Sequence, residues 1–200
     1  MKKDILVVGV GGQGTVLAAK LVALAARLQG EAVRSAETIG MAQRGGPVAS
    51  HVRIGGGAVS PLIPPGGADV LIGFEPWEAL RAAGFLAPGA LAVAAREAVP
   101  PPLAALAAKP QAGDPDAALA AVAARAGKLV AVSRKALLAP GEEKCLNVAL
   151  LGLAVGTGGT GLEADAVREA IVRAVPARFK ETNLEVFEKG FRAAGAETAG

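Results

Sequence analysis

A glycine-rich turn near the N terminus carries the residue types best suited to binding a phosphorylated ligand. Residues 5–10 form an apolar strand pattern, and Gly9, Gly11 and Gly14 stand at the spacing of a dinucleotide-binding turn. Glycine permits the tight turn and a close backbone approach, and the N–H groups that open the next helix carry the positive end of its dipole. The pattern predicts an anion-binding turn, and helix–strand packing alone is the alternative explanation.

A dinucleotide site also places an acidic residue at the end of its second strand. We expect that strand at residues 32–36, so Glu37 is the candidate. The following residues, 38–46, do not resemble a strand-to-helix connection and indicate a second glycine-rich loop. Arg44 lies there beside Gly45, where a planar guanidinium would hold a phosphate or a carboxylate. An ordinary surface cation is the alternative for Arg44.

Three further polar residues are candidates for ligand contact. Gln13 would reach a ligand phosphate or a partner's backbone, or would simply face solvent at the start of the helix. His51 and Arg53 share one face of a predicted strand, so both can point toward the same crevice. A structural role is the competing interpretation for His51.

Several ordered motifs together resemble one protein family. They occupy residues 9–14, 37–38, 42–46, 50–55, 75–81, 147–152 and 183–190. The set resembles the gamma-type domain of the 2-oxoacid:ferredoxin oxidoreductases, and within that family the small beta subunit of the indolepyruvate type. The resemblance runs from Asp4 to about Phe191. Pro47 and Ala49 depart from the pattern, in which a serine often follows the double glycine.

The resemblance implies a shared reaction. An aryl 2-oxoacid such as indolepyruvate, coenzyme A and oxidised ferredoxin would yield the acyl-CoA, carbon dioxide and reduced ferredoxin. Thiamine diphosphate, its magnesium ion and iron–sulfur clusters would belong to a larger alpha subunit, through which ferredoxin is reached. This chain would supply no catalytic residue and would close one wall of the site, with cofactor contacts at Gly11, Gly12, Gln13, Gly14, Arg44, Gly45, His51 and Arg53.

A partner interface is expected where a buried strand ends and the next helix begins. Glu75, Trp77 and Arg81 lie there, and the single tryptophan would anchor a partner chain or cap the core. Asn147 lies in an apolar helix pattern, where a local hydrogen bond is expected. Cys145 reads as a small buried hydrophobe, because nothing near it in the sequence would lower its pKa.

Composition restricts what the chain does alone. One cysteine and one histidine cannot supply an iron–sulfur cluster or a zinc site, so no metal ligand set is predicted. Lys and Arg number 21 against 18 Asp and Glu, without a basic run, which gives no indication of nucleic-acid binding. The first apolar segment is too short for a signal peptide or a membrane span, and the lone cysteine fits a cytoplasmic protein.

Strand and helix patterns alternate along the chain, which favours an α/β fold of one domain over residues 1–200. We expect a doubly wound, mostly parallel Rossmann-like sheet with a β-hairpin inserted after the second strand. The arms of the hairpin, residues 48–54 and 58–62, flank three glycines. A last helix is expected over residues 182–194, stopped by Gly195, and residues 100–110 are expected to form a surface excursion.

Two other functions remain possible on the residues alone. One is a stand-alone NAD(P)-dependent reductase that uses the glycine turn and Glu37. The other is a purely structural subunit whose glycine turn serves only for packing. The family resemblance favours the subunit of a shared oxidoreductase over both.

Overall fold

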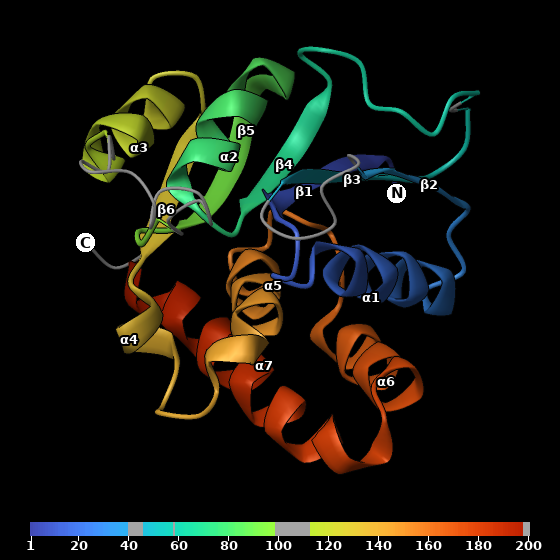
Figure 1. The fold of residues 1–200 in the computed structure, drawn as a ribbon. Helices are drawn as coiled ribbons and strands as arrows, with labels where there is room; N and C mark the ends of the chain where they lie inside the picture. The colour runs from blue at the N-terminus through green and yellow to red at the C-terminus, as the bar shows by residue number, and fades with distance from the viewer. Residues whose placement is uncertain (40–45, 58, 99–112, 198–200) are drawn as a thin grey trace.

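Six strands form one sheet in the order β2-β3-β1-β4-β5-β6 (Figure 1). The computed structural model describes residues 1–39, 46–57, 59–98 and 113–197. The strands are β1 Lys3–Val10, β2 Val33–Ile39, β3 Pro47–Ile54, β4 Ala68–Gly73, β5 Leu86–Ala95 and β6 Lys128–Val132.

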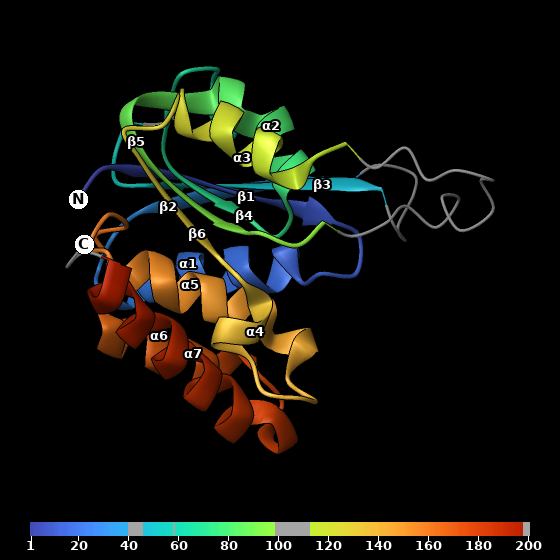
Figure 2. The ribbon, with the colours of Figure 1, turned by 90° about the vertical axis from the view of Figure 1, so that its left-hand side faces the viewer.

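Helices cover both faces of this sheet. They are α1 Thr15–Leu28, α2 Pro76–Ala82, α3 Pro115–Ala123, α4 Arg134–Leu137, α5 Leu146–Gly156, α6 Ala164–Ala174 and α7 Ala177–Glu197, with 3₁₀ turns at Ala83–Phe85 and Glu143–Cys145. Figure 2 shows α2 and α3 on one face and α1, α5, α6 and α7 on the other. Each face of the sheet therefore has its own apolar core. No helix in the described part of the chain is long and apolar enough to cross a membrane.

The order of the strands reverses between β1 and β4. From β1 the chain passes through α1 to β2 at one edge, whereas β4, β5 and β6 follow one another in parallel toward the other edge. A crevice forms outside the carboxyl ends of parallel strands where their order reverses, and ligands bind there in open α/β sheets. The glycine turn after β1 and the start of α2 after β4 lie on the two sides of this point.

The predicted hairpin is wrong in its second arm. Residues 59–62 form no strand, and the hairpin consists instead of β2 and β3, which pair antiparallel from Val33–Ile54 to Ile39–Val48. The reason is that β3 also pairs antiparallel with β1, so both of its edges are already hydrogen-bonded. No free edge remains for another strand. The fold prediction of a mostly parallel, doubly wound sheet with an added hairpin is otherwise confirmed.

Most elements begin where their capping residues predict. Proline opens both α2 and α3, and the preceding Glu75 and Asp114 side chains accept hydrogen bonds from the first turn. The last helix is longer than expected, because α7 starts at Ala177 and continues through Gly195. The predicted excursion at residues 100–110 lies outside the described residues.

Two of the family-like motifs serve close helix packing. Helix α5 is buried along almost its whole length, and α7 packs against it. A Cβ at Gly152 would overlap the carbonyl oxygen of Phe187, and one at Gly190 would overlap that of Ala149. Glycine therefore lets the two backbones touch, and this contact gives α5 a well-defined position under the sheet.

Candidate functional site

The glycine turn uses its glycines for different purposes. Gly12 has φ +100° with open space around it, so this position requires glycine for its conformation. Gly9 has no room for a side chain, because a Cβ would lie 2.6 Å from Gln13 Oε1 and 3.1 Å from Phe74 Cβ. Helix α1 then starts without a side-chain cap or an acidic residue in its first turn, so its positive end has no local counter-charge there.

Gln13 links the ends of β1 and β4, the two strands between which the strand order reverses. Its Oε1 accepts a hydrogen bond from Val10 N at 2.8 Å, and its Nε2 donates to Phe74 O, at the end of β4, at 3.4 Å. Gly11 N donates to Gly46 O at 2.8 Å, which ties the turn to the residue before β3. The Gln13 amide thus holds the turn in place, and both of its polar atoms are engaged within the chain.

Asn147 of α5, a helix packed on one face of the sheet, makes another hydrogen bond to the turn. Its Nδ2 donates to Gly14 O at 3.2 Å, and only 2% of the residue is exposed. This partner is distant in the chain, so the expectation of a local hydrogen bond is wrong. The signal for the role of Asn147 was its position as a lone amide in an otherwise apolar helix.

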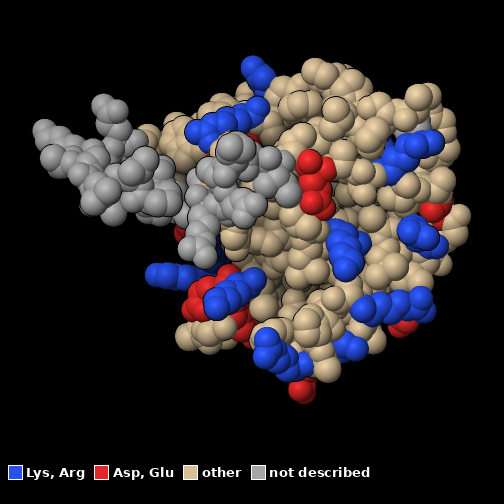
Figure 3. Space-filling view, turned by 45° about the vertical axis from the view of Figure 1, so that its right-hand side comes forward, with Lys and Arg blue, Asp and Glu red and all other residues tan. Residues whose placement is uncertain are grey.

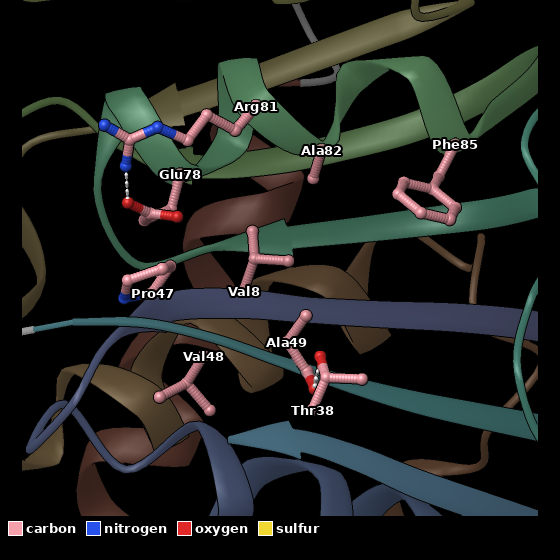
Figure 4. Close-up of a pocket in the computed structure, with 9 residues that line it drawn as sticks. All are labelled: Val8, Thr38, Pro47, Val48, Ala49, Glu78, Arg81, Ala82 and Phe85. Carbon is pink, nitrogen blue, oxygen red and sulfur yellow. Dashed lines mark hydrogen bonds and ion pairs between the residues drawn. The ribbon is translucent and has the colours of Figure 1, made fainter. Parts of the chain in front are cut away.

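An apolar groove of about 430 Å³ opens beside α2 at the same end of the sheet (Figure 4). Its floor is formed by Val8 of β1 and by Pro47 and Ala49 of β3, which point toward α2. Phe85 closes one end. The full lining is Val8, Thr38, Pro47, Val48, Ala49, Glu78, Arg81, Ala82 and Phe85. Sequence patterns did not indicate this groove, because its walls come from five separate elements.

An ion pair between Glu78 and Arg81 stands at the groove. Glu78 is 6% exposed, and burial raises the pKa of its carboxyl group, although the neighbouring Arg81 guanidinium acts in the opposite direction. The Arg81 side chain is 67% exposed. The groove therefore combines an apolar floor with a solvent-facing cation.

Of the three predicted interface residues, Glu75 requires correction. It is 2% exposed, and its carboxylate caps α2 by accepting a hydrogen bond from Glu78 N, so it has no surface to offer a partner. Trp77 is half-buried, and its ring packs against Gly113, where a Cβ would lie 2.6 Å from Cη2. Trp77 and Arg81, one helical turn apart, remain the candidates for a partner contact.

His51 and Arg53 share a face of β3 as predicted, but both bind their own chain. His51 Nδ1 accepts a hydrogen bond from Ile63 N at 3.2 Å, and burial lowers the pKa of the imidazole. Arg53 Nε and Nη2 each lie 2.9 Å from the Asp4 carboxylate, and Nη1 donates to Ser60 O at 3.1 Å. Neither side chain lines the groove.

Of the predicted second glycine-rich loop, residues 40–45, which include Arg44 and Gly45, lie outside the described residues. Thr38 and Ile39 belong to β2, so the second strand runs further than the sequence predicted. Glu37 is exposed on β2, which β3 separates from β1. Two strand spacings, roughly 10 Å, therefore lie between the ends of β1 and β2. A ribose held by Glu37 would not fit a phosphate at the glycine turn as it does in an ordinary dinucleotide site, which disfavours the reductase interpretation.

The remaining groups offer little independent chemistry. Burial is the main cause that raises the pKa of the Cys145 thiol, which fits a packing role. Among the described residues, no cluster of His, Cys, Asp and Glu has the make-up of a metal site. Figure 3 shows basic and acidic side chains dispersed over one face of the molecule without a basic stripe.

Comparison with known proteins gives consistent matches over nearly the whole chain. Residues 4–193 match the profile of the pyruvate ferredoxin/flavodoxin oxidoreductase family. Indolepyruvate oxidoreductase subunit IorB of Archaeoglobus fulgidus is 39% identical, over 97% of this chain and 96% of that protein. The Pyrococcus horikoshii protein of the same name is 34% identical, over 96% and 95%.

Solved structures share the fold. The gamma subunit of keto/oxoacid ferredoxin oxidoreductase from Geobacter sulfurreducens has a TM-score of 0.67 at 24% identity, covering 97% of this chain and 99% of that chain. The 2-oxoglutarate:ferredoxin oxidoreductase from Magnetococcus marinus, described with 2-oxoglutarate, coenzyme A and succinyl-CoA bound, has a TM-score of 0.67 at 18% identity. It matches 98% of this chain but only 31% of that longer chain.

Proposed function

This chain belongs to the pyruvate ferredoxin/flavodoxin oxidoreductase family, and on that premise we propose that it is the non-cluster subunit of an indolepyruvate-type 2-oxoacid:ferredoxin oxidoreductase. The observation that carries the proposal is the match to relatives named indolepyruvate oxidoreductase subunit IorB, at 33–39% identity for three of them and over at least 96% of this chain. The assembled enzyme converts an aryl 2-oxoacid and coenzyme A to the acyl-CoA and carbon dioxide and passes electrons to ferredoxin.

The partner in this proposal is a larger alpha subunit. Thiamine diphosphate, magnesium and iron–sulfur clusters lie on that subunit, and ferredoxin is reduced through it. Two observations support this arrangement: one cysteine cannot hold a cluster, and this chain matches only a third of the longer Magnetococcus marinus chain. The whole of the described chain acts as one domain, and the lone cysteine suits a cytoplasmic enzyme.

This chain contributes binding and orientation. Gly11 N is already bonded to Gly46 O, so the N–H groups of Gly12 and Gly14, at the uncapped helix start, are the ones that fit a phosphate group of coenzyme A. Coenzyme A, when bound, supplies the thiol that accepts the acyl group. The apolar groove, which Arg81 lines, lies at the same end of the sheet as the glycine turn, and the two together form this chain's wall of the shared site. Binding coenzyme A there removes part of its translational freedom before the reaction, so less entropy is lost in the chemical step.

The test is reconstitution of the native complex. This chain, co-expressed with the larger alpha subunit, should yield a brown complex that oxidises indolepyruvate only when coenzyme A and an electron acceptor are present. The isolated chain should show no turnover. A colourless single chain that is active with NAD would instead establish the reductase.

A matched pair of variants tests the role of the turn. Gly12→Asp places a carboxylate beside the proposed phosphate, whereas Gly30→Asp makes the same change at another positive-φ glycine with open surroundings, after α1. Gly12→Asp should raise the KM for coenzyme A at least tenfold, and Gly30→Asp should leave it unchanged. An unchanged KM in both variants would support the purely structural subunit.

A further inference from the structure

We propose that Asn147 is a positioning residue for coenzyme A binding, because its side-chain amide sets the place and direction of the first turn of α1. Asn147 touches no ligand in this proposal and acts through the carbonyl group of Gly14. The inference rests on the proposed function, in which the glycine turn holds a phosphate of coenzyme A.

The Gly14 carbonyl is the contact through which Asn147 acts. Its oxygen accepts the first hydrogen bond of α1, from Ala18 N at 3.0 Å, and also accepts from Asn147 Nδ2 at 3.2 Å. Gly14 has φ +81°, and a Cβ at this position would overlap Asn147 Nδ2. The start of α1 therefore rests directly on the Asn147 amide. A displacement of that amide would move the N–H groups that open the helix.

The helix that carries Asn147 is tightly packed. Asn147 lies in the first turn of α5, and the glycine contacts between α5 and α7 bring these two helices into backbone contact. The other ties of the turn, Gln13 to Phe74 O and Gly11 N to Gly46 O, fix its strand end. Asn147 bonds the N-cap residue itself, at the helix end of the turn. A ligand is positioned well only when the groups that contact it are themselves held by packing and hydrogen bonds.

Stability alone does not account for an amide at this position. Asn147 Oδ1 is buried without a hydrogen-bond partner among the described residues, and an unsatisfied buried acceptor is costly. Leucine has the same branched outline and would suit the apolar neighbours on α5 without that cost. The orientation of the Gly14 carbonyl is the property that leucine would lose.

The experiment uses the assembled complex with three variants of this chain. Asn147→Leu keeps the outline and removes the donor, Asn147→Ala removes both, and Val148→Ala is a control that shortens a buried side chain on the same helix. The readouts are the KM for coenzyme A, the KM for the 2-oxoacid and the melting temperature of the complex. Asn147→Ala keeps the test informative if the larger leucine prevents assembly.

The expected result separates binding from stability. Both Asn147 variants should raise the KM for coenzyme A by about three- to tenfold, as for the loss of one neutral hydrogen bond, and leave the KM for the 2-oxoacid unchanged. Asn147→Leu should melt at or above the wild-type temperature. Val148→Ala should lower the melting temperature without changing the KM for coenzyme A.

Two results would overturn the inference. An unchanged KM for coenzyme A in both Asn147 variants would do so. So would a rise in that KM that accompanies a lower melting temperature and occurs equally in Val148→Ala. The Gly12→Asp variant distinguishes the cause. If it raises the KM while the Asn147 variants do not, only the positioning role fails. If it also has no effect, the coenzyme A contact itself fails.

Discussion

Replacing Gly14 by alanine should destabilise this chain more than the same change at Gly30, although both glycines have φ +81°. An alanine in the left-handed region costs about 1–2 kcal/mol at either position. At Gly30 a Cβ would meet nothing within 4 Å, so the cost should stop there. The pair therefore separates backbone strain from collision.

At Gly14 the added Cβ would overlap Asn147 Nδ2, and the amide would have to move. Losing its hydrogen bond to Gly14 O costs about 0.5–1.5 kcal/mol, and overpacking costs about 1–3 kcal/mol. We therefore expect a total loss of about 2.5–6.5 kcal/mol in the free energy of unfolding for Gly14→Ala. This is about 1.5–4.5 kcal/mol more than for Gly30→Ala.

Urea unfolding of the purified chain, followed by the fluorescence of its single tryptophan, measures both losses. Combining Gly14→Ala with Asn147→Ala should remove the collision and bring the added cost of the Gly14 change down to that of Gly30→Ala. Equal losses for the two single glycine variants would refute the contact between Gly14 and Asn147, and with it the reasoning that the α1 start rests on this amide.

Three further predictions concern buried titratable groups. Burial lowers the pKa of His51, the single histidine, so as the pH falls the imidazole is protonated in the unfolded chain before it is protonated in the folded chain. The stability that the neutral buried imidazole contributes is therefore complete above about pH 6.5 and is lost at lower pH, and His51→Gln should remove much of the decline in urea midpoint between pH 7.5 and 5.5. Glu78→Gln should raise the free energy of unfolding at pH 7.5 by about 1 kcal/mol, because it removes a buried charge whose partner Arg81 is largely exposed; the raised pKa of Glu78 means that this gain should shrink toward pH 4.5, and a gain independent of pH would contradict it. Arg53→Ala should cost about 3–5 kcal/mol by leaving the Asp4 carboxylate buried and unpaired, with part of the loss recovered in the double variant with Asp4→Asn, as a double-mutant cycle would show.

The candidate site shows where prediction from residue types ends. The sequence located the glycine turn and the start of α2, because glycine spacing and a proline after a strand have direct local meanings. It misassigned Glu75, which is buried, and it did not indicate the bonds that Gln13 and Arg53 make within the chain. A side chain's type states which hydrogen bonds it can make. Its partners depend on which distant segments lie beside it.

The sequence by itself determined the kind of most elements and roughly where they lie, since hydrophobic periodicity, caps and turn residues act over a few positions. Only the tertiary structure decided that β3 lies between β1 and β2, which moved the hairpin and separated Glu37 from the glycine turn. It also decided that Asn147 meets Gly14, and that α2 and β3 enclose the groove. The physical reason is that strands and helices compete for the edges and faces of the sheet. The outcome depends on segments far apart in the chain, which a local sequence pattern does not describe.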